Sequence, residues 1–276
     1  MEATRRTLAD QIAEVGKWHA GVNPVREINP DWERIRTLAV PGLTTLSDYR
    51  IRVELGAVDA SVYLRNERSA NPSPDVIREA HRQMFVNVTT DAGRFRKPSD
   101  GNVQFGGRLG VEALRIPVEL ERLDAEMSEL LSQCQTPEDK CAAIAFYHAR
   151  FISIHPFVDG NGRTGRAIMK CQAETLGLKF DMRPLAVDKR TYVDAINHAR
   201  EANDIAPLMR VVAQCTETKP EWRGELVSDT KIYGRLMMDF GDVKPLAEER
   251  ALAKTGLATL PLPSTRGQSL QQEPSF

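Results

Sequence analysis

The sequence contains little cysteine and no excess of charge of either sign, and each of these absences excludes a class of protein. Its four cysteines include no Cys-x-x-Cys pair, which argues against a zinc site or a disulfide framework and favours reduced thiols in a cytoplasmic protein. With 37 basic and 38 acidic side chains, the net charge is −1. This balance supplies no strong field for a polyanion, so neither nucleic acid nor an anionic membrane is expected as a partner.

Long hydrophobic runs are absent as well. No continuous run of apolar residues is close to the length of about 18 residues that a membrane span needs. The first ten residues are charged and lack the apolar core of a secretory signal. We therefore expect no membrane span and a cytoplasmic location. At 276 residues and 41% hydrophobic content, the chain is long enough to bury a substantial core.

Helical periodicity is what the sequence has in abundance. Ile51, Leu55, Val58 and Val62 recur three or four residues apart, and helix-start signals such as Ser73-Pro74-Asp75 and Thr136-Pro137-Glu138-Asp139 precede other apolar segments. These patterns predict an all-α fold. Helices are expected over about residues 7–15, 31–40, 47–66, 74–88, 117–131, 137–152, 161–176, 188–203 and 207–215. The helix over 137–152 is apolar on most faces, which is typical of a central helix.

Residues 91–108 interrupt the helical pattern with four glycines and a proline. Asp100-Gly101-Asn102 is a turn signal, and Val103-Gln104-Phe105 is the one short stretch in this region that favours a strand. A small β-hairpin is therefore predicted here.

The twelve residues from His155 to Arg166, HPFVDGNGRTGR, combine a base, an acid and two arginines. His155 follows an apolar helix end and precedes Pro156, which ends the helix. An imidazole with a pKa near neutrality suits removal of a proton from an attacking hydroxyl. Asp159 offers carboxylate oxygens to a hard cation such as Mg²⁺. His148, seven residues before His155, is expected to be a buried hydrogen-bonding residue rather than a second base.

The second half of this segment suits an anion. Gly160-Asn161-Gly162 allows successive N–H groups to point at one phosphate, and the helix that follows adds its N-terminal dipole. Arg163 and Arg166 lie on one face of that helix and can bind phosphate oxygens. Taken singly, such features are more often structural, because a lone histidine, a Gly-Asn-Gly loop and a pair of arginines are all common. Their combination in one segment favours phosphoryl-group chemistry.

The segment resembles the signature of the Fic (Fic/Doc) family, His-x-Phe-x-Asp/Glu-Gly-Asn-Gly-Arg-x-x-Arg, with every fixed position present. The resemblance extends from Gly93 to Val212. It implies an all-α, Fic-type helical bundle with a small β-hairpin flap over the active-site loop. It also implies a protein adenylyltransferase that moves AMP from ATP, with Mg²⁺, to a tyrosine, threonine or serine hydroxyl of a target protein.

The resemblance also assigns roles to residues. His155 is implied as the catalytic base and Asp159 as the Mg²⁺ ligand, with Arg163 on the β- or γ-phosphate and Arg166 on the γ-phosphate. The nucleotide-binding set is Gly160, Asn161, Gly162, Arg163, Arg166 and, by a looser match, Tyr192. The flap that registers a target segment by strand addition is Val103, Gln104, Phe105, Gly106 and Gly107.

The predicted organisation has four parts: an N-terminal helical region (1–90), a Fic core domain (91–218), a C-terminal helical extension (219–255) and a disordered tail (256–276). The tail is rich in proline, serine and glutamine, which disfavours a packed core.

Several alternatives stay open on the sequence alone. Doc kinases carry lysine where Gly162 stands, so Gly162 favours AMP transfer over phosphorylation, but related family members transfer UMP or phosphocholine. Removal of AMP from modified proteins and a nonenzymatic nucleotide-binding adaptor are the other interpretations. Many members restrain themselves with a Ser/Thr-x-x-x-Glu-Gly/Asn helix, to which the only partial match is Ser269–Glu273. The chain is therefore expected to be unrestrained, or to be held by a separate antitoxin chain that lends a glutamate.

Overall fold

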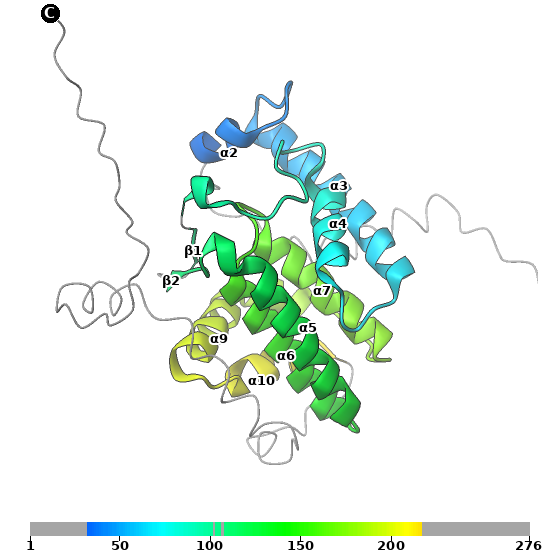
Figure 1. The fold of residues 1–276 in the computed structure, drawn as a ribbon. Coiled ribbons are helices and arrows are strands. Elements are labelled where there is room, and N and C mark those ends of the chain that lie inside the picture. Colours follow the sequence, from blue (N-terminus) through cyan, green and yellow to red (C-terminus); the bar gives the residue numbers. More distant parts are fainter. Residues whose placement is uncertain (1–31, 102, 106–107, 217–276) are drawn as a thin grey trace, which may run out of the picture.

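Helices form nearly all the regular structure in the residues that the computed structural model describes, which are 32–101, 103–105 and 108–216 (Figure 1). In chain order they are α2 (Trp32–Leu38), α3 (Leu46–Glu67), α4 (Pro74–Phe85), α5 (Ile116–Gln133), α6 (Pro137–Ile154), α7 (Asn161–Thr175), α8 (Arg183–Val187), α9 (Lys189–Ala202) and α10 (Ala206–Gln214). Two short strands, β1 (Gln104–Phe105) and β2 (Arg108–Leu109), pair antiparallel. The mostly helical fold is as predicted.

The helix-start signals of the sequence act as caps. The Thr45 hydroxyl accepts a hydrogen bond from the backbone N–H of Asp48 at the start of α3. At the start of α6, Thr136 and Asp139 each accept a hydrogen bond from the other's backbone N–H. Such caps satisfy N–H groups that have no partner inside the helix, and they fix where each helix begins.

One predicted boundary shifts by three residues. The helix that Ser73 caps ends at Phe85 instead of continuing to Val88. The reason is tertiary, because the carbonyl of Val88 accepts a hydrogen bond from the N–H of Val40 at 3.1 Å. The chain leaves the helix in order to pair with the segment that follows α2.

Helix α6 lies at the centre of the described fold (Figure 1). Nearly all of its residues are buried, as its apolar faces predict, and α5, α7 and α10 pack against it. Helix α7 also contacts α3 and α4, and these two helices pack against each other. The C-terminal end of α6 and the first turn of α7 therefore meet inside the molecule, within reach of α3, α4 and α9.

One helix of the structure was not predicted, and several predicted segments lie outside the described residues. Helix α8 was not predicted, because its five residues are too few to show a helical period. The predicted helix over 7–15, the extension 219–255 and the tail 256–276 lie outside the described residues, and the division at residue 90 stays a prediction. Residues 102, 106 and 107 are also outside, so the hairpin flap stays a prediction. Within the part of the chain that is described, no helix combines the length and the hydropathy that crossing a membrane requires.

Candidate active site

The loop that joins α6 to α7 begins at His155 and ends at Gly160, and both residues have left-handed backbone, with φ of +53° and +81°. His155 closes α6, because its N–H donates to the carbonyl of Phe151 at 3.0 Å. The carbonyl of Gly160 accepts from the N–H of Thr164 at 2.9 Å and so begins α7. Left-handed backbone costs a residue with a side chain about 1–2 kcal/mol. Strain of this kind at a non-glycine residue is characteristic of functional sites.

The His155 ring is held in one tautomer. Its Nδ1 lies 3.2 Å from the carbonyl oxygen of Ile152, which can only accept, so Nδ1 carries the proton and donates. In the neutral ring Nε2 then has the lone pair. Burial lowers the pKa of His155 to about 4, and the charges of Arg96 and Arg200 act in the same direction. The ring is therefore neutral at pH 7 and able to accept a proton.

Arg96 is a buried cation that holds the end of α6. Its Nε donates to the carbonyl of His155 at 2.7 Å, and its Nη2 donates to the carbonyls of Val111 at 2.6 Å and Ile154 at 3.3 Å. Its backbone N–H donates to the carbonyl of Pro156 at 2.8 Å. One guanidinium thus fixes the backbone on which the base is mounted, and its charge complements the C-terminal end of the helix dipole.

The segment after β2 packs directly behind the base. A Cβ added to Gly110 would lie 2.7 Å from the Cβ of His155, so this position admits only glycine. Arg200 of α9 is buried and donates from Nη2 to the carbonyl of Leu109 at 3.2 Å. Helix α9 and the strand β2 are therefore joined at the site.

The loop is closed by its own asparagine. The side chain of Asn161 is buried, accepts from the N–H of Phe157 at 2.9 Å and donates to the carbonyl of Phe157 at 2.8 Å. This pair of bonds fixes the spacing between the base and the start of α7. A Cβ on Gly160 would lie 2.5 Å from the Phe85 ring, so glycine is required by space as well as by φ.

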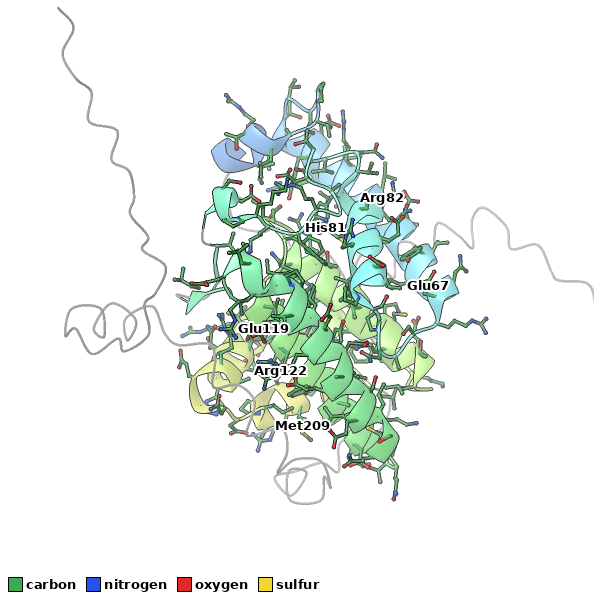
Figure 2. The ribbon with its side chains drawn as sticks, viewed as in Figure 1. Glu67, His81, Arg82, Glu119, Arg122 and Met209 are labelled. Atoms are coloured by element: carbon green, nitrogen blue, oxygen red, sulfur yellow. The ribbon has the colours of Figure 1, made fainter. Side chains whose placement is uncertain are left out.

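His81 connects the loop to α4 (Figure 2). Its Nδ1 accepts from the N–H of Gly93 at 2.9 Å, so its Nε2 donates to the carbonyl of Asp159 at 3.0 Å. The ring stacks on Phe157 with centroids 3.8 Å apart. Burial lowers the pKa of His81 to about 4, which keeps the ring neutral and maintains this pattern of donor and acceptor.

Arg163 is turned into the interior. It is buried, its guanidinium lies 4.8 Å from the centroid of the Phe85 ring, and its Nη1 donates to the Tyr49 hydroxyl at 2.6 Å. Its Nη2 donates to Oδ2 of Asp159 at 2.9 Å. The sequence prediction placed this arginine on a nucleotide phosphate, whereas here it donates hydrogen bonds to Tyr49 of α3 and to Asp159 of the loop.

Arg166 faces a different set of groups. The ring Nε2 of His148 and the hydroxyl of Tyr192 are 2.6 Å apart, and both residues are buried. Burial and, to a lesser extent, the charge of Arg166 lower the pKa of His148 to about 3, while burial raises the pKa of Tyr192. His148 is therefore a buried hydrogen-bonding residue, as predicted. A Cβ on Gly162 would lie 3.3 Å from Nη1 of Arg166, so the guanidinium passes close to the start of α7.

Asp159 is the group that could bind a metal ion. Its side chain is 47% exposed, although Arg163 contacts its Oδ2. Among the residues described, no group of three histidines, cysteines or carboxylates is arranged to hold a metal. A single exposed carboxylate fits Mg²⁺, which is bound through one or two carboxylates and takes its other ligands from phosphates and water.

The predicted site residues are brought together, apart from the flap. The loop and the first two turns of α7 carry His155, Asp159, Gly160, Asn161, Gly162, Arg163 and Arg166. Tyr192 comes from α9 and contacts Arg166. Val103 is buried, and its carbonyl accepts from the N–H of Gly110 at 3.0 Å. Gln104 and Phe105 form β1, whereas Gly106 and Gly107 lie outside the described residues.

Sequence reasoning missed Tyr49, His81, Arg96 and Arg200. His81 had a usable signal, because it interrupts an apolar stripe that includes Ile77 and Met84, and a histidine there must find partners. Tyr49 had none, since it lies 110 residues before Asp159 and only the tertiary fold brings the two together.

Residues 71–173 match the sequence model of the Fic/DOC family. A protein adenylyltransferase Fic from Nematostella vectensis is 29% identical to the chain over 191 residues, which cover 65% of this chain and 40% of that protein. The chain thus spans less than half the length of this relative.

Solved structures give the same fold. A Fic-domain-containing signalling protein from Bacteroides thetaiotaomicron matches with a TM-score of 0.54 and 18% identity, covering 76% of this chain and 88% of that one. BepC, an effector protein from Bartonella tribocorum determined with bound AMPPNP, matches with a TM-score of 0.51 and 17% identity, covering 67% of this chain and 98% of that one.

Proposed function

Residues 71–173 form a domain of the Fic/DOC family, and from this premise we propose that the chain transfers AMP from ATP to a tyrosine, threonine or serine hydroxyl of a target protein. The relative from Nematostella vectensis carries the name of this activity. We propose the same activity for this chain because it has a base at His155, an anion site at the start of α7 and a carboxylate at Asp159.

The observation that carries the proposal is the state of His155. A neutral imidazole with its proton on Nδ1 is the form that can accept a proton from an attacking hydroxyl, and it stands one short loop away from the start of α7. The buried guanidinium of Arg96 holds its backbone carbonyl, and Gly110 packs against its Cβ, which favours a base kept at a fixed position.

In this proposal the polyphosphate of ATP lies against the start of α7. The first N–H groups of a helix have no partner inside it and attract an anion, which suits Gly160, Asn161 and Gly162 for the α- and β-phosphates. Arg166 is the proposed γ-phosphate residue, and Tyr192 lies beside it. Arg163 donates to Tyr49 and Asp159 in this structure, so two of its N–H groups are directed away from the proposed phosphate site.

Asp159 is the proposed ligand of Mg²⁺, which would neutralise charge on the phosphates when bound. Val103, Gln104, Phe105, Gly106 and Gly107 are the proposed flap, whose backbone would register an extended segment of the target. An antitoxin chain that supplies a glutamate stays a prediction, as does the cytoplasmic location, and Ser269–Glu273 lies outside the described residues.

Transfer of label from [α-³²P]ATP to proteins of a cell lysate tests the proposal. The wild-type chain is expected to produce labelled bands, and His155→Ala to lower the rate by about 10²–10⁴-fold while ATP still binds. His198→Ala is the matched control, because this histidine is exposed on α9 and bonds to Asp204. Full activity in His155→Ala would remove the base from the proposal, and ATP binding without any labelling would favour the adaptor. Release of AMP from an already modified protein would favour the reverse reaction.

A further inference from the structure

Tyr49 belongs to α3, which begins far upstream of the motif and outside the residues that match the family. Its hydroxyl accepts from Nη1 of Arg163 at 2.6 Å and donates to Oδ2 of Asp159 at 3.4 Å. Arg163 donates to the same oxygen at 2.9 Å. Oδ2 of Asp159 thus accepts hydrogen bonds from both the Tyr49 hydroxyl and the Arg163 guanidinium, which are also hydrogen-bonded to each other.

The two supporting side chains are fixed, whereas the carboxylate is not fixed by burial. Tyr49 is 3% exposed and Arg163 is 5% exposed, but the side chain of Asp159 is 47% exposed. The guanidinium is also held between rings, 5.6 Å from the centroid of Tyr49 and 4.8 Å from that of Phe85. A half-exposed aspartate loses its choice of rotamer only when such partners bind it, because burial alone does not restrict it.

We propose that Tyr49 is a positioning residue, which acts with Arg163 to hold the Asp159 carboxylate in the orientation that binds the Mg²⁺ of a metal–nucleotide complex. This inference rests on the proposed function. It moves Arg163 from a direct contact with phosphate to an indirect role through Asp159. Groups that orient a metal ligand are worth about 10–100-fold in metal affinity, so a hydroxyl outside the motif can set the affinity for the metal.

The two roles of Arg163 make opposite predictions for Tyr49→Phe, which removes the hydroxyl and keeps the ring. If Tyr49 positions Asp159, the loss of the hydroxyl weakens the binding of MgATP. If Tyr49 instead keeps Arg163 from a phosphate, the loss frees a donor and strengthens it. Tyr147→Phe is the matched control, because that buried hydroxyl on α6 bonds to the carbonyl of Pro72.

Calorimetric titration of the full chain with ATP, once with Mg²⁺ and once with EDTA, measures the effect. Tyr49→Phe is expected to weaken MgATP binding about tenfold and to leave metal-free ATP binding unchanged, which also shows that the variant is folded. Tyr147→Phe is expected to match the wild type in both titrations. In an Asp159→Asn background, Tyr49→Phe is expected to have no further effect, because the oriented carboxylate is gone.

Each other outcome overturns the inference. Equal or tighter MgATP binding by Tyr49→Phe would show that the hydroxyl does not support the metal ligand, and the proposed function would stand without it. An equal loss with and without Mg²⁺, or the same loss in the Asp159→Asn background, would assign Tyr49 a purely structural role. A wild-type chain that binds no MgATP would remove the proposed function and this inference together.

Discussion

Substituting Gly160 by alanine tests whether packing against the Phe85 ring constrains the loop between α6 and α7. The residue has φ of +81°, and a Cβ would lie 2.5 Å from two carbon atoms of the Phe85 ring. Phe85 is itself 1% exposed and packs against His81 and Arg163, so the ring has no open space into which it can move.

The expected cost has two parts that a control can separate. Left-handed backbone costs a residue with a side chain about 1–2 kcal/mol, and forcing an extra group into a packed core costs about 1–3 kcal/mol more. Gly42 has φ of +84° and nothing within 4 Å of its would-be Cβ, so Gly42→Ala meets only the first part. The free energy of unfolding is therefore expected to fall by about 2–5 kcal/mol in Gly160→Ala and by about 1–2 kcal/mol in Gly42→Ala.

Urea unfolding of both variants, followed by circular dichroism, measures this difference, and MgATP titration measures its effect at the site. We expect Gly160→Ala to weaken MgATP binding, since the displaced Phe85 ring moves Arg163, and Gly42→Ala to leave it unchanged. Adding Phe85→Leu should restore part of the stability of Gly160→Ala by making room for the methyl group. Equal destabilisation by the two alanines would refute the argument from the Phe85 contact.

The remaining predictions concern protonation and the backbone of the base. Burial holds the pKa of His81 and His155 at about 4 and that of His148 at about 3, whereas an unfolded histidine titrates at about 6.5. The unfolded chain therefore binds these protons first, so the free energy of unfolding should decrease as the pH falls from about 6.5 to about 4. Urea midpoints at about pH 7.5, 6 and 4.5 check this, and a midpoint that stays constant would contradict it. Arg96→Lys keeps a cation but replaces the two separated donor nitrogens, Nε and Nη2, by a single ammonium nitrogen that cannot reproduce their geometry. The transfer rate should therefore fall about 10–100-fold while MgATP affinity is unchanged, as measured by labelling and calorimetry.

The parts of the fold that could be predicted are those fixed by neighbouring residues. Ser73 and Thr136 predict helix starts because each hydroxyl accepts a hydrogen bond from the backbone N–H three residues later in the chain. Gly177, with φ of +77°, follows the end of α7 for an equally local reason. The motif residues belong to this class too, since one loop and one helix start carry them all.

The supporting residues could not be predicted, because each depends on a contact across the fold. An arginine such as Arg96 is expected at the surface when only the sequence is known. In the structure it is 3% exposed and donates to backbone carbonyls 58 and 59 positions away. Arg163 was predicted to face a phosphate because helical spacing places it with Arg166 on one side of α7. Spacing fixes the direction in which a side chain leaves its helix, but the ring of Tyr49, from another helix, decides where the guanidinium ends.

These buried arginines also bear on how the proposed transfer would proceed. Arg96 and Arg200 satisfy carbonyls beside His155, and the same charges help to hold the pKa of the imidazole at about 4. A base this weak cannot deprotonate an alcohol in advance, because the pKa of the alcohol lies far above that of the imidazole. In the proposed transfer the proton would therefore pass to Nε2 of His155 as the new O–P bond forms to the α-phosphorus and the bond to the departing pyrophosphate breaks. In the proposed transfer the site would accordingly supply a neutral proton acceptor, and the hydrogen bonds from Arg96 would keep that acceptor at a fixed position.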